Sequence, residues 1–274
     1  MGKIKSTTSR TLITLVCLTL STTLSARTIE VGEGKVFSSI TMAINTAKPH
    51  DEILVYGKKI YKERLLINKP ITLKGVGTPI IDGSKKGNVI EIKADNVVIE
   101  GLQIQNSARS SQRDYCGVHV NNAQAVVVRN CFFRKNQFSV MYQNCKDGLV
   151  ANNNISSDIT YNPIMGNAVH CWKSDNMHIT GNKIGHNRDG IYLEFVNNSH
   201  IDHNTINGCA RYGLHFMFSH FNVYNSNQFY CNQAGVAVMF AHNVEMINNT
   251  FEYNRGTSSY GLLIKELPVS YTHL

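Results

Sequence analysis

Histidine and methionine recur at alternate positions in short segments that each begin with a small residue. In residues 213–217 and 235–239, the side chains of His215, Met217 and Met239 alternate with apolar ones. In a β-strand this alternation places the apolar set on the buried face and the other set on the outer face. Thioether and imidazole groups suit Cu(I), and imidazole also suits Cu(II). The chemistry that these residues favour is the binding of a soft metal ion.

Aligning the segments by their first small residue arranges the outward side chains in two columns. The small residues are Gly117, Ser139, Ala168, Gly190, Gly213, Gly235 and Gly261. The first column contains His119, Met141, His170, Tyr192, His215 and Ala237, and the second contains Asn121, Gln143, Trp172, Glu194, Met217 and Met239. Neighbours in such a column lie about 4.8 Å apart. We predict that His215, Met217 and Met239 bind one Cu(I) ion transiently, with His170 as a further ligand.

The same strip supports a second interpretation, because methionine and aromatic side chains also favour adaptable protein interfaces. In that case the strip is a docking surface that binds no metal. The side chains expected to contact a partner protein are Met141, Trp172, Tyr192 and Glu194. Spacing alone leaves both interpretations open.

Polysaccharide cleavage is the alternative function, because secreted repeat proteins of this composition often act on polysaccharides. Glycoside hydrolysis needs two carboxyl groups about 5–10 Å apart. Asp189, Glu194 and Asp202 are the acids near one segment, but no second acid shares the column of Glu194. No Lys or Arg aligns with them as the base of a lyase, and Asp189 and Asp202 fit turn positions. We therefore expect no catalytic residues, with a lyase or hydrolase as the alternative.

A second repeat predicts the elements that position these columns. It places an asparagine three residues after an apolar residue, and successive asparagines lie 22 to 29 residues apart. They are Asn130, Asn153, Asn182, Asn204, Asn227 and Asn249. Units of this length, built from short β-branched and aromatic strands, indicate a stacked solenoid. We predict an all-β fold, a right-handed parallel β-helix of about nine or ten coils, in which the asparagines hydrogen-bond from coil to coil.

The N-terminal part is expected to cap this solenoid. Residues 28–31 form a first strand, and a short amphipathic helix follows Ser38 or Ser39 and ends before Pro49. Its apolar stripe contains Ile40, Ala43, Ile44 and Ala47. Further strands are expected at residues 52–56, 71–74, 89–93 and 97–104. The helix would cover an edge that is otherwise exposed, so residues 27–50 form the cap of a single domain over residues 27–268.

The ends of the chain carry different signals. Residues 1–26 combine Lys3, Lys5 and Arg10 with an apolar stretch and small residues, as a secretory signal peptide does. This predicts export to the periplasm or out of the cell, and the periplasm is the location that we expect. Residues 269–274 lack the polar cap that ends a solenoid, and we expect them to be a non-native tail. The formal charge of +8 is spread along the chain without a basic run, so we expect no nucleic-acid partner.

Two cysteines are expected to pair. Cys209 and Cys231 each lie four residues before the small residue of their segment. Equal spacing would stack them in neighbouring coils, within the range of a disulfide bond. An oxidising compartment would favour that bond.

Several segments resemble the NosD family of nitrous oxide reductase maturation proteins. The specific ones are residues 189–193, 211–220 and 234–240, and residues 31–35, 67–71 and 81–83 match its beginning. The resemblance implies a periplasmic accessory protein that handles copper for nitrous oxide reductase. It also implies an ABC transporter permease and ATPase pair and a copper chaperone as partners. The family pattern coincides with His215, Met217 and Met239, and members of the family continue beyond the length of this sequence.

Overall fold

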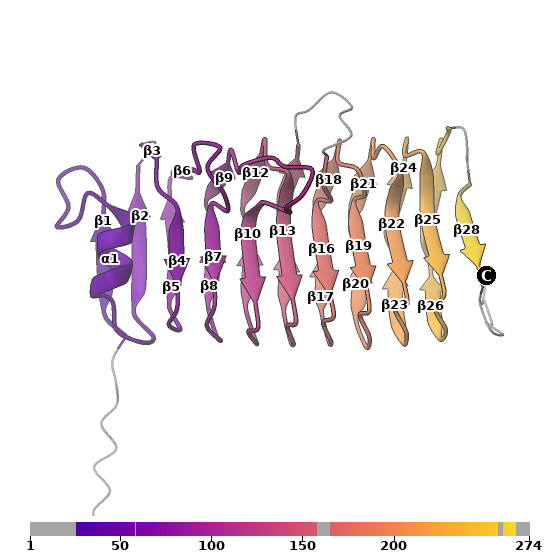
Figure 1. The fold of residues 1–274 in the computed structure, drawn as a ribbon, viewed down its shortest axis with the longest axis horizontal. Helices are drawn as coiled ribbons and strands as arrows, with labels where there is room; N and C mark the ends of the chain where they lie inside the picture. Colours follow the sequence, from indigo (N-terminus) through magenta and orange to yellow (C-terminus); the bar gives the residue numbers. More distant parts are fainter. Residues whose placement is uncertain (1–25, 58, 158–164, 257–259, 267–274) are drawn as a thin grey trace, which may run out of the picture.

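Three parallel β-sheets make up the fold. A computed structural model describes residues 26–57, 59–157, 165–256 and 260–266. The expected terminal tail and all but Ala26 of the expected signal peptide lie outside these residues. Each coil adds one strand to each sheet in turn, and the coils stack along the long axis of the molecule (Figure 1). The prediction of an all-β parallel β-helix with a short N-terminal helix is confirmed.

The strand bounds follow the repeat. Sheet A contains β1 (Thr28–Val31), β2 (Glu52–Tyr56), β5 (Thr72–Val76), β8 (Val98–Glu100), β11 (Val127–Arg129), β14 (Leu149–Ala151), β17 (His178–Thr180), β20 (His200–Asp202), β23 (Asn222–Asn225) and β26 (Val244–Ile247). Sheet B contains β3 (Ile60–Tyr61), β6 (Ile80–Asp82), β9 (Gln103–Gln105), β12 (Phe132–Arg134), β15 (Asn154–Ser156), β18 (Lys183–Gly185), β21 (Thr205–Asn207), β24 (Gln228–Tyr230) and β27 (Thr250–Glu252). Sheet C contains β4 (Leu65–Ile67), β7 (Ile90–Ile92), β10 (Cys116–Asn121), β13 (Phe138–Gln143), β16 (Val169–Trp172), β19 (Ile191–Glu194), β22 (Tyr212–Met217), β25 (Ala234–Met239) and β28 (Leu262–Lys265).

The apolar sets of the three sheets meet in one continuous core. Val236 and Val238 are buried, as the alternation predicts. The strand expected at residues 97–104 is instead two strands, β8 and β9, because Gly101 has a φ of 70° and turns the chain between them. Glycine adopts this conformation without a steric penalty.

The asparagine ladder forms at the corner between sheets A and B. Each side-chain Nδ2 donates to the Oδ1 of the next asparagine, at 3.0 Å from Asn153 to Asn182 and 2.9 Å from Asn182 to Asn204. The ladder continues through Asn227 to Asn249. The prediction for Asn130 is wrong, because Cys131 occupies that place and its backbone N–H donates to Asn153 Oδ1. Asn130 is an exposed corner residue with a φ of 55°.

The helix α1 (Ile40–Thr46) lies at the N-terminal end of the solenoid (Figure 1). Ser39 is its N-cap and accepts a hydrogen bond from Met42 N–H, and Ile40, Ala43 and Ile44 are buried. Glu63, from the following coil, adds a second cap. Its carboxylate accepts hydrogen bonds from the N–H groups of Ile40 and Thr41 and from the hydroxyls of Ser39 and Thr41. The otherwise unpaired N–H groups of the first turn are thereby satisfied.

We expect the substitution Glu63→Ala to lower the free energy of unfolding by about 1–2 kcal/mol, because two backbone donors lose their acceptor. Burial alone would raise the pKa of Glu63, but the hydrogen bonds from Thr41, Ser39 and Ile40 outweigh it and lower the pKa. The contribution is therefore present above the unfolded-state pKa of about 4.3 and is lost as the pH falls through the lower folded-state pKa. Urea unfolding at neutral and acidic pH measures it. The exposed Glu33→Ala is the control, and an equal loss there would contradict the cap.

Candidate functional site

The predicted outward columns form on sheet C with the expected register. Tyr192 pairs with His215 and His215 pairs with Ala237 in the first column. Glu194 pairs with Met217 and Met217 with Met239 in the second. The two methionines therefore occupy adjacent strands, β22 and β25, with His215 two residues before Met217 on the same face.

Glycine makes this close stacking possible at the start of the strands. A Cβ atom on Gly190 would lie 2.4 Å from the carbonyl oxygen of Gly213, and one on Gly213 would lie 2.6 Å from that of Gly235. These distances are shorter than any real Cβ contact. The repeated small residue thus allows each coil to approach the next, and it fixes the position of the side chains on either side of it.

Burial differs between the columns. Met217 and Met239 are half-buried, whereas His215, His170 and Met141 have relative exposures of only 3%, 7% and 8%. Met141 packs against Phe138 and Cys116 outside the main core. The outward strip is therefore buried at Met141, His170, His215 and Ala237 of the first column, whereas His119 and Tyr192 of that column stay partly exposed. Of the predicted docking residues, Trp172, Tyr192 and Glu194 keep partly exposed side chains.

Aromatic rings stack along the first column. The ring centroids of His170 and Tyr192 lie 4.8 Å apart, and those of Tyr192 and His215 lie 4.6 Å apart. Phe138 extends the stack beyond His170, at 5.8 Å. Because the Tyr192 ring lies between the two imidazoles, the structure does not bring His170 into the group formed by His215 and the methionines. His170 Nε2 instead lies 3.9 Å from Glu194 Oε2.

A buried ion pair supports His215 from the other side. Asp189 is fully buried, and Arg211 Nε donates to its Oδ1 at 2.8 Å, while Arg211 Nη2 donates to Oδ2. His215 Nδ1 lies 3.6 Å from Asp189 Oδ2 and 3.5 Å from Arg211 Nη2. Burial by itself would raise the pKa of Asp189, but the hydrogen bonds and the charge of Arg211, with His215 close by, outweigh it and lower the pKa. Asp189 is therefore a buried carboxylate that needs its partners.

Asp189 and Arg211 are the residues that sequence reasoning missed. Asp189 was assigned to a turn, and no arginine appeared to align with the acids. Asp189 precedes Gly190 directly, whereas Arg211 precedes Gly213 by two positions, so counting from the glycine does not bring them together. The sequence did contain one signal for this ion pair: Asp189 is a charged residue directly before Gly190, where a buried strand begins.

Several ring nitrogen atoms in the first column have no hydrogen-bond partner. Among the described residues, His215 Nε2 and both ring nitrogens of His170 are buried without a hydrogen bond. Buried polar groups of this kind normally have a partner, so each requires an explanation. Imidazole and thioether are donors of the kind that Cu(I) prefers, and the strand register places His215, Met217 and Met239 on the same face of neighbouring strands. Histidine, cysteine and carboxylate side chains alone form no metal-binding group of three within the described ranges.

The predicted disulfide does not form. Cys209 is buried and Cys231 is exposed, and both are free thiols. The coil partner of Cys209 is Asn232, whose Oδ1 accepts a hydrogen bond from Cys209 N–H at 3.0 Å. Asn232 lies three residues before Gly235, whereas Cys209 lies four before Gly213. The corner before Gly235 is one residue shorter than the corner before Gly213, which shifts Cys231 out of register.

Among the described residues, no helix is long and apolar enough to cross a membrane.

Comparisons with known proteins give a family match and a fold match. A family model described as "Periplasmic copper-binding protein (NosD)" matches residues 156–270. A "Probable ABC transporter binding protein NosD" from Pseudomonas aeruginosa is 24% identical over 132 residues, which cover 47% of this chain and 31% of that protein. A "Cell surface glycoprotein" from Methanothermus fervidus is 32% identical over 125 residues, covering 44% of this chain and 20% of that protein. The matched part thus spans less than a third of either relative.

The similar solved structures include enzymes that act on polysaccharides. An alginate lyase from Paenibacillus has a TM-score of 0.57 at 14% identity, covering 88% of this chain and 99% of that one. A Family 28 exopolygalacturonase from Yersinia enterocolitica has a TM-score of 0.59 at 9% identity, covering 89% of this chain and 71% of that one. At these identities the likeness establishes the parallel β-helix fold and nothing more.

Proposed function

We propose that this chain is a periplasmic accessory protein of the NosD type that receives and passes on Cu(I). The match to a copper-binding family model supports this proposal, since the matched residues 156–270 contain His215, Met217 and Met239. A similar protein is named as an ABC transporter binding protein. The partners proposed are an ABC transporter permease and ATPase pair, a copper chaperone and nitrous oxide reductase.

The observation that carries the proposal is the register of Met217 and Met239 beside a histidine with an unpaired nitrogen. Two thioethers and one imidazole form a soft, uncharged donor set, which favours Cu(I) over harder cations. Both methionines are partly exposed, so a partner's ligands can reach a bound ion and replace them one at a time. The neighbouring side chains of Trp172, Tyr192 and Glu194 are the proposed docking surface for that partner.

An anaerobic Cu(I) titration tests the function directly. We expect the protein to retain about one equivalent of Cu(I) in competition with a chromogenic Cu(I) chelator, since one such donor set is present. We expect Zn²⁺ at the same concentration not to displace it, because zinc prefers nitrogen and oxygen or thiolate ligands to thioethers. If the chelator removed all of the copper at equimolar concentration, the copper function would be rejected and a metal-free docking scaffold would replace it.

A second candidate function is action on an acidic polysaccharide, and the cluster around Asp189 favours it. A carboxylate behind an imidazole, with a tyrosine stacked on that imidazole, can position a general base and a general acid. Burial raises the pKa of Tyr192 to about 12, which would keep its hydroxyl protonated. Incubation with alginate or polygalacturonate, followed by ultraviolet absorbance, detects the unsaturated ends that a lyase releases. Their appearance in the wild type, and their loss in Tyr192→Phe, would favour this candidate over copper handling.

A further inference from the structure

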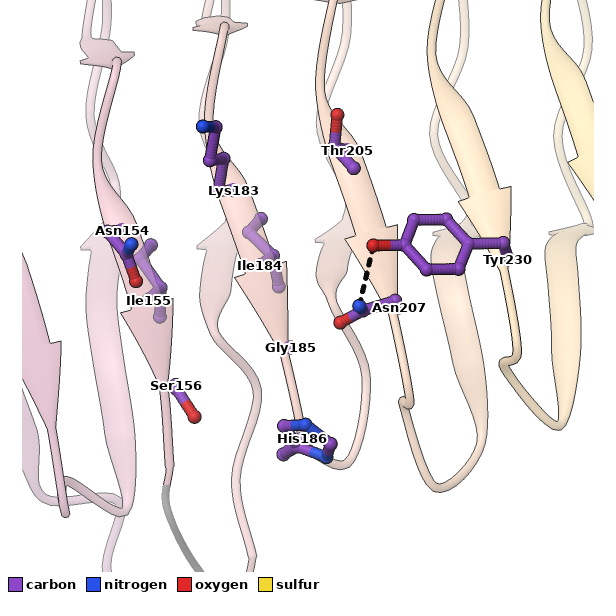
Figure 2. Close-up of a pocket in the computed structure, with 10 residues that line it drawn as sticks. All are labelled: Asn154, Ile155, Ser156, Lys183, Ile184, Gly185, His186, Thr205, Asn207 and Tyr230. Atoms are coloured by element: carbon purple, nitrogen blue, oxygen red, sulfur yellow. Dashed lines mark hydrogen bonds between the residues drawn. The ribbon is translucent and has the colours of Figure 1, made fainter.

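An open, shallow hollow edged by polar side chains lies on the outer face of sheet B, away from the sheet C columns. Its volume is about 460 Å³, and strands β15, β18, β21 and β24 contribute to it (Figure 2). This size falls within the range of roughly 300–1,000 Å³ that is typical of small-molecule sites. The lining side chains that carry the argument are Asn154, Lys183, Thr205, Asn207 and Tyr230.

The absence of a side chain at position 185 makes room for a neighbouring amide that lines the hollow. Gly185 pairs with Ser156 on one side and with Asn207 on the other. A Cβ atom on Gly185 would lie 2.6 Å from Asn207 Oδ1. The amide of Asn207 therefore leans over the space that any other residue at position 185 would occupy. Polar side chains from the neighbouring coils line the hollow together with Ile155 and Ile184.

The walls offer hydrogen-bond donors and acceptors in fixed positions. Asn207 Nδ2 donates to Tyr230 Oη at 2.7 Å, which orients both groups and leaves the phenolic proton available for donation (Figure 2). Asn154 Oδ1 accepts from Arg134 Nη2 at 3.0 Å, so the amide of Asn154 is oriented as well. Paired amide and hydroxyl groups, held in place before a ligand arrives, suit the hydroxyl groups of a sugar ring.

The charge of the hollow indicates which sugars it takes. Lys183 is exposed at its edge, and none of its ten lining residues is an aspartate or glutamate. We propose that this hollow binds a uronate-containing oligosaccharide, with Lys183 contacting a carboxylate and Tyr230 and Asn207 contacting ring hydroxyls. Such a site does not depend on copper, because each coil contributes separate strands to sheets B and C.

Filling the hollow is the most direct test. The substitution Gly185→Val adds a side chain that suits a strand and displaces the Asn207 amide. We expect it to weaken binding of an oligomannuronate or oligogalacturonate by roughly tenfold or more, measured by titration calorimetry. Thr250→Val, on the same face but outside the hollow, is the control and is expected to leave the affinity unchanged.

Two milder variants keep the test decisive if Gly185→Val does not fold. Tyr230→Phe is expected to lower the affinity about threefold to tenfold, because it removes one hydrogen-bonding hydroxyl. Lys183→Gln is expected to lower the affinity and to flatten its salt dependence, because screening acts on exposed charges. Unchanged affinity in both variants, or equal binding of a neutral oligosaccharide, would overturn the proposal. Cu(I) retention in the same variants is expected to equal that of the wild type.

Discussion

Replacing Met217 and Met239 together by leucine is expected to lower the Cu(I) affinity by roughly 100-fold or more. Leucine keeps the size and apolar character of methionine but has no sulfur donor. The two side chains pair across β22 and β25, so the double substitution removes both soft ligands beside His215. A single imidazole remains, and one nitrogen holds Cu(I) weakly. Competition with a chromogenic chelator under anaerobic conditions measures the change.

Met141→Leu is the matched control for this experiment. Met141 lies in the neighbouring column of sheet C, and its sulfur is buried against Cys116. We expect this variant to bind Cu(I) as the wild type does. If the double variant also kept its copper, the ion would be held elsewhere, and the half-buried methionines would be interpreted as part of the docking surface alone.

The substitution Asp189→Ala is expected to lower the free energy of unfolding by about 3–5 kcal/mol, the usual cost of removing one partner from a buried ion pair. Asp189 has no exposed surface and satisfies the side chain of Arg211 and the backbone N–H of Tyr212. Without the carboxylate, a guanidinium stays in a partly buried site with no opposite charge. Urea unfolding at neutral pH measures the loss.

Asp202→Ala provides the comparison. Asp202 bonds to His178 and His203, whose side chains are 50% and 66% exposed. Exposed pairs contribute about 0–1 kcal/mol, so this change is expected to cost much less. Replacing Asp189 by leucine and Arg211 by methionine together is expected to recover most of the stability, because no buried charge is then left unpaired. Equal losses for Asp189→Ala and Asp202→Ala would contradict the burial argument.

Short-range patterns were sufficient to predict the fold. Alternation in residues 235–239 places Val236 and Val238 inside on any regular strand, and the asparagines recur at the length of one coil. Both signals depend only on backbone geometry that every coil shares. The strands β1 and β2 and the helix α1 accordingly lie where the sequence predicts them.

Register at the corners limited the prediction. Asn130 and Cys231 each lie one position away from the residue that fills the expected place. The corner before Gly235 is one residue shorter than the corner before Gly213, which explains Cys231, whereas Asn130 follows the apolar-x-x-Asn pattern although Cys131 is the residue that faces Asn153. A one-residue slip moves a side chain from the core to the surface. The hydrogen bonds between neighbouring coils decide which register is formed, and no count from a single small residue detects that difference.

The sequence by itself determined the solenoid, its N-terminal cap and the two columns that bring Met217, Met239 and His215 onto one face. Only the tertiary structure decided how those side chains are covered. The Tyr192 ring separates His170 from His215, and Arg211 pairs with Asp189 behind His215. These contacts join side chains from different coils. Burial, ring stacking and ion pairing depend on distances between those side chains in space. A periodic pattern along the chain predicts only whether each side chain lies on the inner or the outer face of its strand.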